Sequence, residues 1–244
     1  MPNTTRHGKK KIGRLYGVGV GPGDPELLTL RAYHLLSRIP VIFVPLKDEK
    51  SSSYARSVIK NLVKKSDGKV VGVVLPMLRD KEKLADYWLK AAESMWRYLK
   101  KGEDCAFVNR GDPLLYGTFI HILETLQKSH PEIEVEVIPG ISSISAAAAR
   151  AVVPLASNDE RIAIISGNRA DKVIRETLEN FDTVVFIKMN KVFDRLLTIL
   201  EELKLVEKCV YVRRCTTQDE EIIRDIGKLK GEKADYFSLL IVRK

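Results

Sequence analysis

Short apolar runs of strand length alternate along the chain with longer segments whose apolar residues recur at helical spacing. This alternation is typical of an α/β protein with mainly parallel sheets. In the helical segments the apolar positions step by three or four, as at Leu84, Trp88 and Ala91. The pattern predicts strands at 15–20, 41–44, 70–75, 105–108, 133–138, 162–166, 183–187, 209–212 and 237–242, with helices at 28–39, 84–98, 171–180 and 192–203 among those between them.

The same pattern divides the chain into two parts. The alternation runs to a helix at 146–153, pauses in a polar stretch at 154–159, and then resumes. We therefore predict two α/β domains, residues 1–155 and 156–244. The last strand follows a charged connection at 219–235, which predicts that the second sheet is partly antiparallel.

The bulk composition is that of an ordinary globular protein, with 45% hydrophobic and 30% charged residues. No apolar run reaches the roughly 18 residues that suggest a membrane-spanning helix. The basic stretch at 6–14 leads into glycines and prolines, which indicates a frayed tail and not a targeting peptide. We expect a cytoplasmic protein with no membrane partner.

The cysteines and histidines predict neither a disulfide nor a metal site. Cys105, Cys209 and Cys215 form no CxxC pair and lie in segments predicted to be folded, as expected of reduced thiols in a cytosolic enzyme. The 4 histidines are scattered without the spacing of metal ligands.

The positive charge has several explanations. A net charge of +9 fits a solvated Lys- and Glu-rich surface, a nucleic acid partner or a polyanionic small molecule. The aromatic content of 7% offers no stacking platform, and no nucleic-acid-binding module is present. We expect no nucleic acid partner, but charge alone does not separate the other two explanations.

Three loops at the ends of predicted strands carry the candidate chemistry. In the first, GVGVGPGDPE at 17–26, glycines let the backbone turn tightly and approach a ligand closely. Asp24 and Pro25 suit the cap and first position of a helix, so a tight turn before a capped helix explains this loop equally well. The spacing misses GxGxxG, and the second strand runs into VPLK at 44–47 without the acidic residue that a dinucleotide site expects there.

The second loop, NRGDPLLYGT at 109–118, repeats Gly-Asp-Pro, with Asp112 predicted to cap the next helix. The third, IPGISSIS at 138–145, leads into a helix through small residues. Capping or close packing explains each loop alone. In a parallel sheet, however, such loops emerge together at the carboxyl edge, where ligands bind, so the combination favours a binding site.

At these residues the sequence resembles the tetrapyrrole methylase family, which includes uroporphyrinogen-III and precorrin methyltransferases and diphthine synthase. The matching pieces are VGVGPGDPELLTLRA at 18–32, RGDPLLYGTF at 110–119 and VIPGISSISAAAA at 137–149, and the resemblance extends over nearly the whole chain. VIFVP at 41–45 and VVLPMLRDKEKL at 73–84 look like the branch that methylates C-20 of precorrin-2, with or without cobalt. Pro45 stands where the uroporphyrinogen-III branch normally has an acidic residue.

The resemblance implies a two-domain α/β methyltransferase, usually a homodimer, that binds S-adenosyl-L-methionine between its domains and releases S-adenosyl-L-homocysteine. Carried over position by position, it implies cofactor contacts at Pro22, Arg110, Gly111, Asp112, Leu115, Ser142, Ser143, Lys188, Met189 and Cys215. For Lys188 a surface lysine, and for Cys215 ordinary packing, explains the residue equally well.

Methyl transfer from a sulfonium needs alignment more than acid catalysis, so we expect no protein nucleophile. Tyr116 is the candidate substrate contact, and Asp112 is expected to act by positioning. The implied substrate is a polycarboxylate tetrapyrrole, which the positive charge of the protein would attract. Basic residues are candidates for pairing with its carboxylates, namely Arg79, Lys81, Lys83, Arg110, Arg161 and Arg169, although a solvated surface charge explains each one singly.

Two alternatives stay open. The first alternative is a methyltransferase of the same family that does not act on C-20 of precorrin-2. It would methylate another precorrin position, uroporphyrinogen-III, or the modified histidine that diphthine synthase methylates. Outside the enzyme class, the chain is a basic α/β protein that binds a nucleotide or nucleic acid. Whether the substrate carries cobalt is not determined by the sequence.

Overall fold

The structure is a computed structural model and describes residues 11–50, 53–63, 68–76 and 80–244. The chain forms two compact units, Met1–Ile141 and Ser142–Lys244. Within the described residues, no helix has the length and apolar character needed to span a membrane.

The first unit is built on a parallel sheet with the strand order β3-β2-β4-β1-β5. Its strands are β1 (Leu15–Gly19), β2 (Val41–Leu46), β3 (Lys69–Val74), β4 (Cys105–Asn109) and β5 (Val135–Ile138). Every pair of neighbours is parallel. Helices cover both faces, which is why a central strand such as β4 is buried along its whole length.

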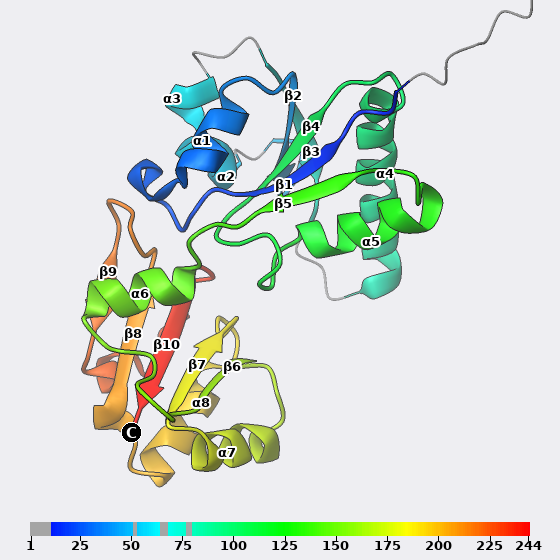
Figure 1. The fold of residues 1–244 in the computed structure, drawn as a ribbon. Helices are drawn as coiled ribbons and strands as arrows, with labels where there is room; N and C mark the ends of the chain where they lie inside the picture. Colours follow the sequence, from blue (N-terminus) through cyan, green and yellow to red (C-terminus); the bar gives the residue numbers. More distant parts are fainter. Residues whose placement is uncertain (1–10, 51–52, 64–67, 77–79) are drawn as a thin grey trace, which may run out of the picture. The chain divides into compact units, whose positions relative to one another are not determined.

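The two faces of this sheet carry different helices (Figure 1). One face holds α1 (Leu30–Leu36), α2 (Tyr54–Val58) and α3 (Lys60–Val63), and the other holds α4 (Lys81–Leu99) and α5 (Phe119–Ser129). Alternate residues of each strand therefore enter different cores. Val18 and Val108 pack with α1, whereas Phe43 and Phe107 pack with α4 and α5.

The second unit has a mixed sheet with the order β6-β7-β10-β8-β9. Its strands are β6 (Ile162–Ser166), β7 (Thr183–Ile187), β8 (Cys209–Arg213), β9 (Glu221–Ile223) and β10 (Ser238–Arg243). β6 and β7 are parallel, while β10 runs antiparallel to both β7 and β8. The predicted antiparallel character of the last strand is thus confirmed.

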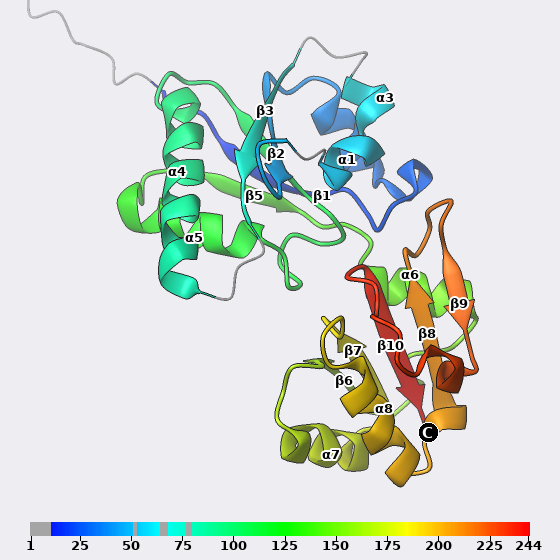
Figure 2. The same ribbon diagram turned by 180° about the vertical axis from the view of Figure 1, so that it is seen from behind.

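Helices also cover both faces of the second sheet (Figure 2). α6 (Ser143–Ala151) lies on one face, and α7 (Asp171–Asn180) and α8 (Phe193–Glu202) lie on the other. Single turns of 3-10 helix connect other elements: η1 (Pro25–Leu27), η2 (Val206–Lys208) and η3 (Ile226–Leu229).

The structure moves the boundary between the units. The sequence placed it near residue 155, after the helix at 146–153, whereas the chain divides between Ile141 and Ser142. The reason is the small-residue face of α6, since Ala147 and Ala151 pack against Val210 and Ile241 of the second sheet. α6 is therefore the first element of the second unit.

Two predicted helix starts were wrong. Asp24 accepts a hydrogen bond from the Glu26 amide, but it caps only the turn η1, and α1 begins later with Thr29 as its cap. Asp112 accepts from the Leu114 amide in a turn, and α5 begins only at Phe119. A cap followed by proline also fits a single turn, which periodicity does not distinguish from a helix. The short strand β9, inside the connection at 219–235, was not predicted.

Candidate functional site

The three loops singled out in the sequence follow β4, β1 and β5, which are adjacent strands of the first sheet. All three strands are parallel, so their loops leave at the same, carboxyl edge. The chain leaves β1 toward the face that holds α1, and it leaves β4 toward the face that holds α5. Neighbouring strands whose connections go to opposite faces form a topological switch point, the usual ligand position in an open α/β sheet.

The loops are joined to one another by hydrogen bonds. The Gly111 amide donates to the Gly21 carbonyl at 2.8 Å, in an isolated antiparallel bridge between the first two loops. The Arg110 Nε donates to the Pro22 carbonyl at 2.7 Å. The Gly140 amide donates to the Asp112 carboxylate at 3.0 Å, which joins the second loop to the third.

The glycines are required by this close packing. A Cβ on Gly19 would lie 2.5 Å from the Gly140 Cα, and a Cβ on Gly140 would lie 2.3 Å from the Gly111 carbonyl oxygen. Both neighbours are backbone atoms that no side-chain rotation can move away. Gly21 and Gly111 also have φ of 76° and 70°, which L-residues rarely adopt. Backbone packing between the loops therefore accounts for Gly19 and Gly140, and positive φ accounts for Gly21 and Gly111.

The side chains of Arg110 and Asp112 connect the loops to one another. The sequence predicted a positioning role for Asp112 but not this role for Arg110. Both carboxylate oxygens of Asp112 accept backbone amides, from Leu114 and Gly140. Asn109, buried at the end of β4, donates its side-chain amide to the carbonyls of Arg110 and Asp112. These side chains hold the edge in shape, and a ligand there would meet backbone groups and the exposed side chains.

The exposed side chains of the second loop are apolar. Leu114, Leu115 and Tyr116 are 52%, 39% and 48% exposed. Tyr116 has φ of 56°, which is uncommon for a residue other than glycine and most often marks a turn or a functional position. An apolar segment beside a row of backbone groups is the composition expected of a binding site for a flat organic ligand.

The second unit brings together two of the predicted segments. Lys188 and Met189 follow β7, and Cys215 follows β8, with only the start of β10 between the two strands. The side chains of Met189 and Cys215 are buried, so a ligand would meet the backbone of these segments. Asn168, after β6, donates to the Lys188 carbonyl at 3.3 Å.

Left-handed backbone marks the same segments. Lys188 has φ of 57°, and Arg214 and Thr216, on either side of Cys215, have φ of 48° and 63°. This conformation costs a residue with a Cβ roughly 1–2 kcal/mol. Asn158 and Lys204 share it in ordinary turns, and Val152 shares it at the C-cap of α6. This conformation is uncommon for a β-branched residue such as Thr216, which is held in it by its surroundings.

Among the remaining predicted residues, the described side chain of Arg161 lies away from the carboxyl edges of both sheets. Arg79 lies outside the described residues, and Lys81 begins α4 with a side chain that is not described. Arg161 precedes β6, at the opposite edge of the second sheet, where it pairs with Asp182 and lies over the Phe181 ring. Ser142 caps α6 by accepting from the Ser145 amide, and Ser143 begins that helix.

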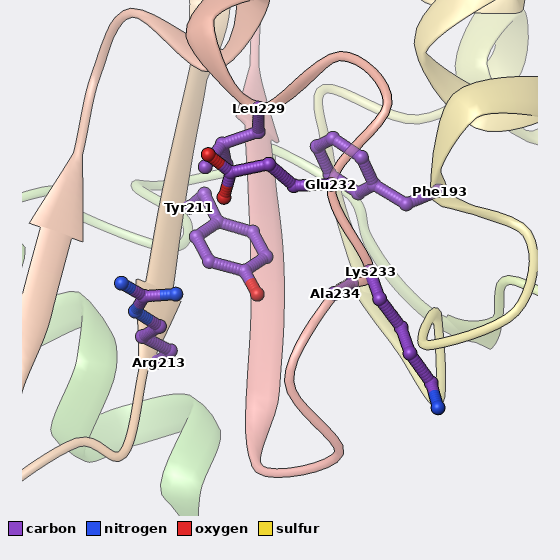
Figure 3. A pocket seen from close by; sticks show the side chains of 7 residues that line it. All are labelled: Phe193, Tyr211, Arg213, Leu229, Glu232, Lys233 and Ala234. Carbon is purple, nitrogen blue, oxygen red and sulfur yellow. The ribbon is translucent and has the colours of Figure 1, made fainter.

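A separate pocket lies in the second unit (Figure 3). It has an empty volume of about 180 Å³ and is lined by Phe193, Tyr211, Arg213, Leu229, Glu232, Lys233 and Ala234. This volume includes space open to solvent, so the enclosed part of the pocket is far smaller than the about 300–1,000 Å³ of pockets for drug-sized molecules. The Tyr211 hydroxyl accepts from the Asp235 amide, so it already has a structural partner. We assign no ligand to this pocket.

The cysteines are buried thiols in no disulfide. Burial raises the pKa of Cys105 and of Cys209 to about 12, so neither is a nucleophile at neutral pH. Within the described ranges, no three His, Cys, Asp or Glu side chains gather as metal ligands would.

The fold and the loops together define an α/β protein of two units. The first unit has the architecture of domains that bind ligands at the carboxyl edge of a parallel sheet. A family profile described as "Tetrapyrrole (Corrin/Porphyrin) Methylases" matches residues 14–230. The chain belongs to this family.

Similar proteins extend over the same length. The chain is 36% identical to a probable cobalt-precorrin-2 C(20)-methyltransferase of Methanocaldococcus jannaschii, over 96% of this chain and 98% of that protein. It is 30% identical to a precorrin-2 C(20)-methyltransferase of Sinorhizobium sp, over 95% of each. Its fold matches a uroporphyrin-III C-methyl transferase from Thermus thermophilus, complexed with S-adenyl homocysteine, with a TM-score of 0.65 and 25% identity, over 95% of this chain and 98% of that one.

Proposed function

We propose that this protein is an S-adenosylmethionine-dependent methyltransferase that methylates C-20 of precorrin-2 or its cobalt form. The observation that carries the proposal is the linked edge of the first sheet, where Arg110, Gly111 and Asp112 hold three loops together at a switch point. Membership of the tetrapyrrole methylases supports methyl transfer. The C(20) names of two relatives that match the chain over nearly its full length support the position.

The residues of the first unit fit a nucleoside cofactor. The linked loops present backbone groups at fixed positions, and Leu115 beside them offers apolar surface for a flat base. Bound there, S-adenosylmethionine would supply an electrophilic methyl group. We assign cofactor contacts to Pro22, Arg110, Gly111, Asp112 and Leu115 in the first unit, and to Ser142, Ser143, Lys188, Met189 and Cys215 in the second.

The protein's own task in this reaction is alignment. A reduced tetrapyrrole has electron-rich meso carbons, so the chain has to hold the two reactants in line and exclude water. Tyr116, half exposed and held in a left-handed conformation, is the proposed substrate contact. Arg79, Lys81 and Arg161 are proposed partners for substrate carboxylates, and for Arg161 the existing pair with Asp182 weighs against this role.

The assembly, location and partners of the protein complete the proposal. We propose a homodimer in the cytoplasm, with no nucleic acid or membrane partner. Light scattering after size-exclusion chromatography tests the dimer, and a single species of monomer mass would contradict it.

The activity is tested by incubating the protein with S-adenosylmethionine carrying a ¹³C-labelled methyl group, in parallel with metal-free and cobalt-loaded precorrin-2. We expect one new methyl resonance, assigned to C-20, with one of the two substrates preferred. A methyl at another carbon would overturn the position but keep the class. Tight, salt-dependent binding to duplex DNA without binding of S-adenosylhomocysteine would overturn the class.

A further inference from the structure

The turn that follows β8 is held in an unfavourable shape by a carboxylate. Arg214 and Thr216 both have left-handed backbone, with Cys215 between them. Glu220, immediately before β9, accepts a hydrogen bond from the Thr216 amide at 2.6 Å through one of its oxygens, Oε2. Its side chain is only 10% exposed, so this contact is shielded from water.

The other oxygen of the same carboxylate binds α6. The Arg150 guanidinium, in the last turn of α6, reaches the Glu220 Oε1 with its Nε at 2.8 Å and with its Nη2 at 2.6 Å. Glu220 therefore connects the Cys215 turn to α6, the helix that begins with Ser142 and Ser143. The Cys215 side chain packs in the core beneath α6, so charge and packing connect the same two segments.

The carboxylate is ionised at neutral pH. Burial by itself raises the pKa of Glu220, but hydrogen bonds from Arg150, Thr216 and the Cys215 thiol outweigh it and hold that pKa below its usual value. An ionised acceptor makes a stronger hydrogen bond to an amide than a neutral one does. A neutral side chain of the same shape would therefore hold the turn less firmly.

A second group of charges holds the other end of the turn. Arg214 pairs with Asp219 at 3.1 Å and with Asp235 at 2.9 Å, and its amide donates to the Phe237 carbonyl. The turn is therefore fixed on both sides of Cys215. A strained conformation fixed by several independent contacts suggests that the shape itself is used.

We propose that Glu220 is a positioning residue, whose carboxylate joins α6 to the Arg214–Thr216 turn and so sets the backbone that meets the cofactor at Cys215. The inference rests on the proposed function, because the turn has this role only if the chain binds S-adenosylmethionine. Glu220 touches neither reactant and acts through the turn.

The test compares E220Q with E221Q. Glu221 is the next residue along the chain and also pairs with an arginine, Arg213 at 2.6 Å, but it makes no contact with the Cys215 turn. Binding of S-adenosylhomocysteine is measured by calorimetry at a temperature where circular dichroism shows each variant folded. Exchange of the backbone amides of residues 214–220 is followed in parallel by mass spectrometry.

We expect E220Q to weaken binding of S-adenosylhomocysteine by roughly tenfold or more and to speed amide exchange in the turn. E221Q should leave both unchanged. A purely structural role for Glu220 would lower the melting temperature and leave the dissociation constant of the folded protein unaltered. That result, or unchanged exchange in the turn, would overturn the inference while the proposed function stands.

Two further results complete the test. If E220Q does not fold, R150Q removes the same ion pair from the exposed side, and we expect a smaller loss of binding in the same direction. Unchanged binding by R150Q would count against the connection to α6. If the unmodified protein fails to bind S-adenosylhomocysteine, the proposed function falls and this inference falls with it.

Discussion

At the scale of single residues, the carboxyl edge of the first sheet depends on backbone that packs against backbone. Gly19 and Gly140 allow two loops to approach within the distance that a Cβ would fill. The side chains of Arg110 and Asp112 then hold the loops in register by donating to and accepting from main-chain groups. A substitution here acts on all three loops at once, because each loop is bonded to its neighbour.

Gly140→Ala tests this dependence. The new Cβ would meet the Gly111 carbonyl oxygen at 2.3 Å, so the loops must separate. We expect a loss of about 1–3 kcal/mol in unfolding free energy and of most of the affinity for S-adenosylhomocysteine, measured by urea denaturation and calorimetry. Gly227→Ala is the control, because its Cβ would meet only an Asp225 side-chain oxygen at 3.4 Å. Equal effects of the two substitutions would contradict this account.

The buried thiols of Cys105 and Cys209 predict a loss of stability at high pH. Burial raises the pKa of each to about 12, above the ordinary value of 9.0. Between these values the unfolded chain releases protons that the folded chain retains, so stability falls as pH rises above 9. Each thiol should contribute up to about 1.4 kcal/mol per pH unit in this range.

Urea denaturation at several pH values from 8 to about 10.5 measures this loss. The double variant C105A/C209A is the comparison, since lysines and tyrosines titrate in the same range in both proteins. We expect the free energy of unfolding of the double variant to fall less steeply with rising pH than that of the unmodified protein. Parallel curves would show that the two thiols do not control this dependence.

At the scale of elements, α6 decides where the second unit begins. Its small residues cover one face of the second sheet, where Val185, Val212 and Leu239 are buried beneath them. Without α6 this face would expose a continuous apolar surface, which in a soluble protein leads to association. The helix therefore belongs with the strands that follow it.

Two fragments test this assignment. We expect residues 142–244 to fold alone, because that fragment keeps the cores on both faces of its sheet. Residues 156–244 should aggregate or bind a hydrophobic dye, because they lack α6. Circular dichroism and light scattering measure both outcomes. Cooperative unfolding of the shorter fragment as a monomer would show that α6 is dispensable.

At the scale of the whole molecule, the net charge of +9 sets an expectation for the substrate. A tetrapyrrole with several carboxylates is attracted by a basic protein, and salt screens that attraction. The cofactor carries both positive and negative groups, so this attraction contributes much less to its binding. We expect salt between about 0.05 and 0.5 M to weaken binding of a polycarboxylate porphyrin far more than binding of S-adenosylhomocysteine. Equal salt dependence, measured by fluorescence and calorimetry, would contradict an electrostatic role.

The sequence by itself determined the described strands other than β9, their α/β order, the three loops and the family. These features follow from local chemistry, because apolar periodicity sets each element and glycine, proline and aspartate mark the turns between them. It could not place the boundary at Ile141, since the burial of α6 depends on strands far along the chain.

Only the tertiary structure decided how the candidate site is held together. Asp112 looks like a helix cap in the sequence, yet it joins Leu114 to Gly140 across two loops. Glu220 lies in a charged connection that carries no signal, and its role depends on Arg150, which lies 70 residues earlier. Hydrogen bonds of this kind form between segments that pairing of the strands has already brought together, and local sequence does not contain that information.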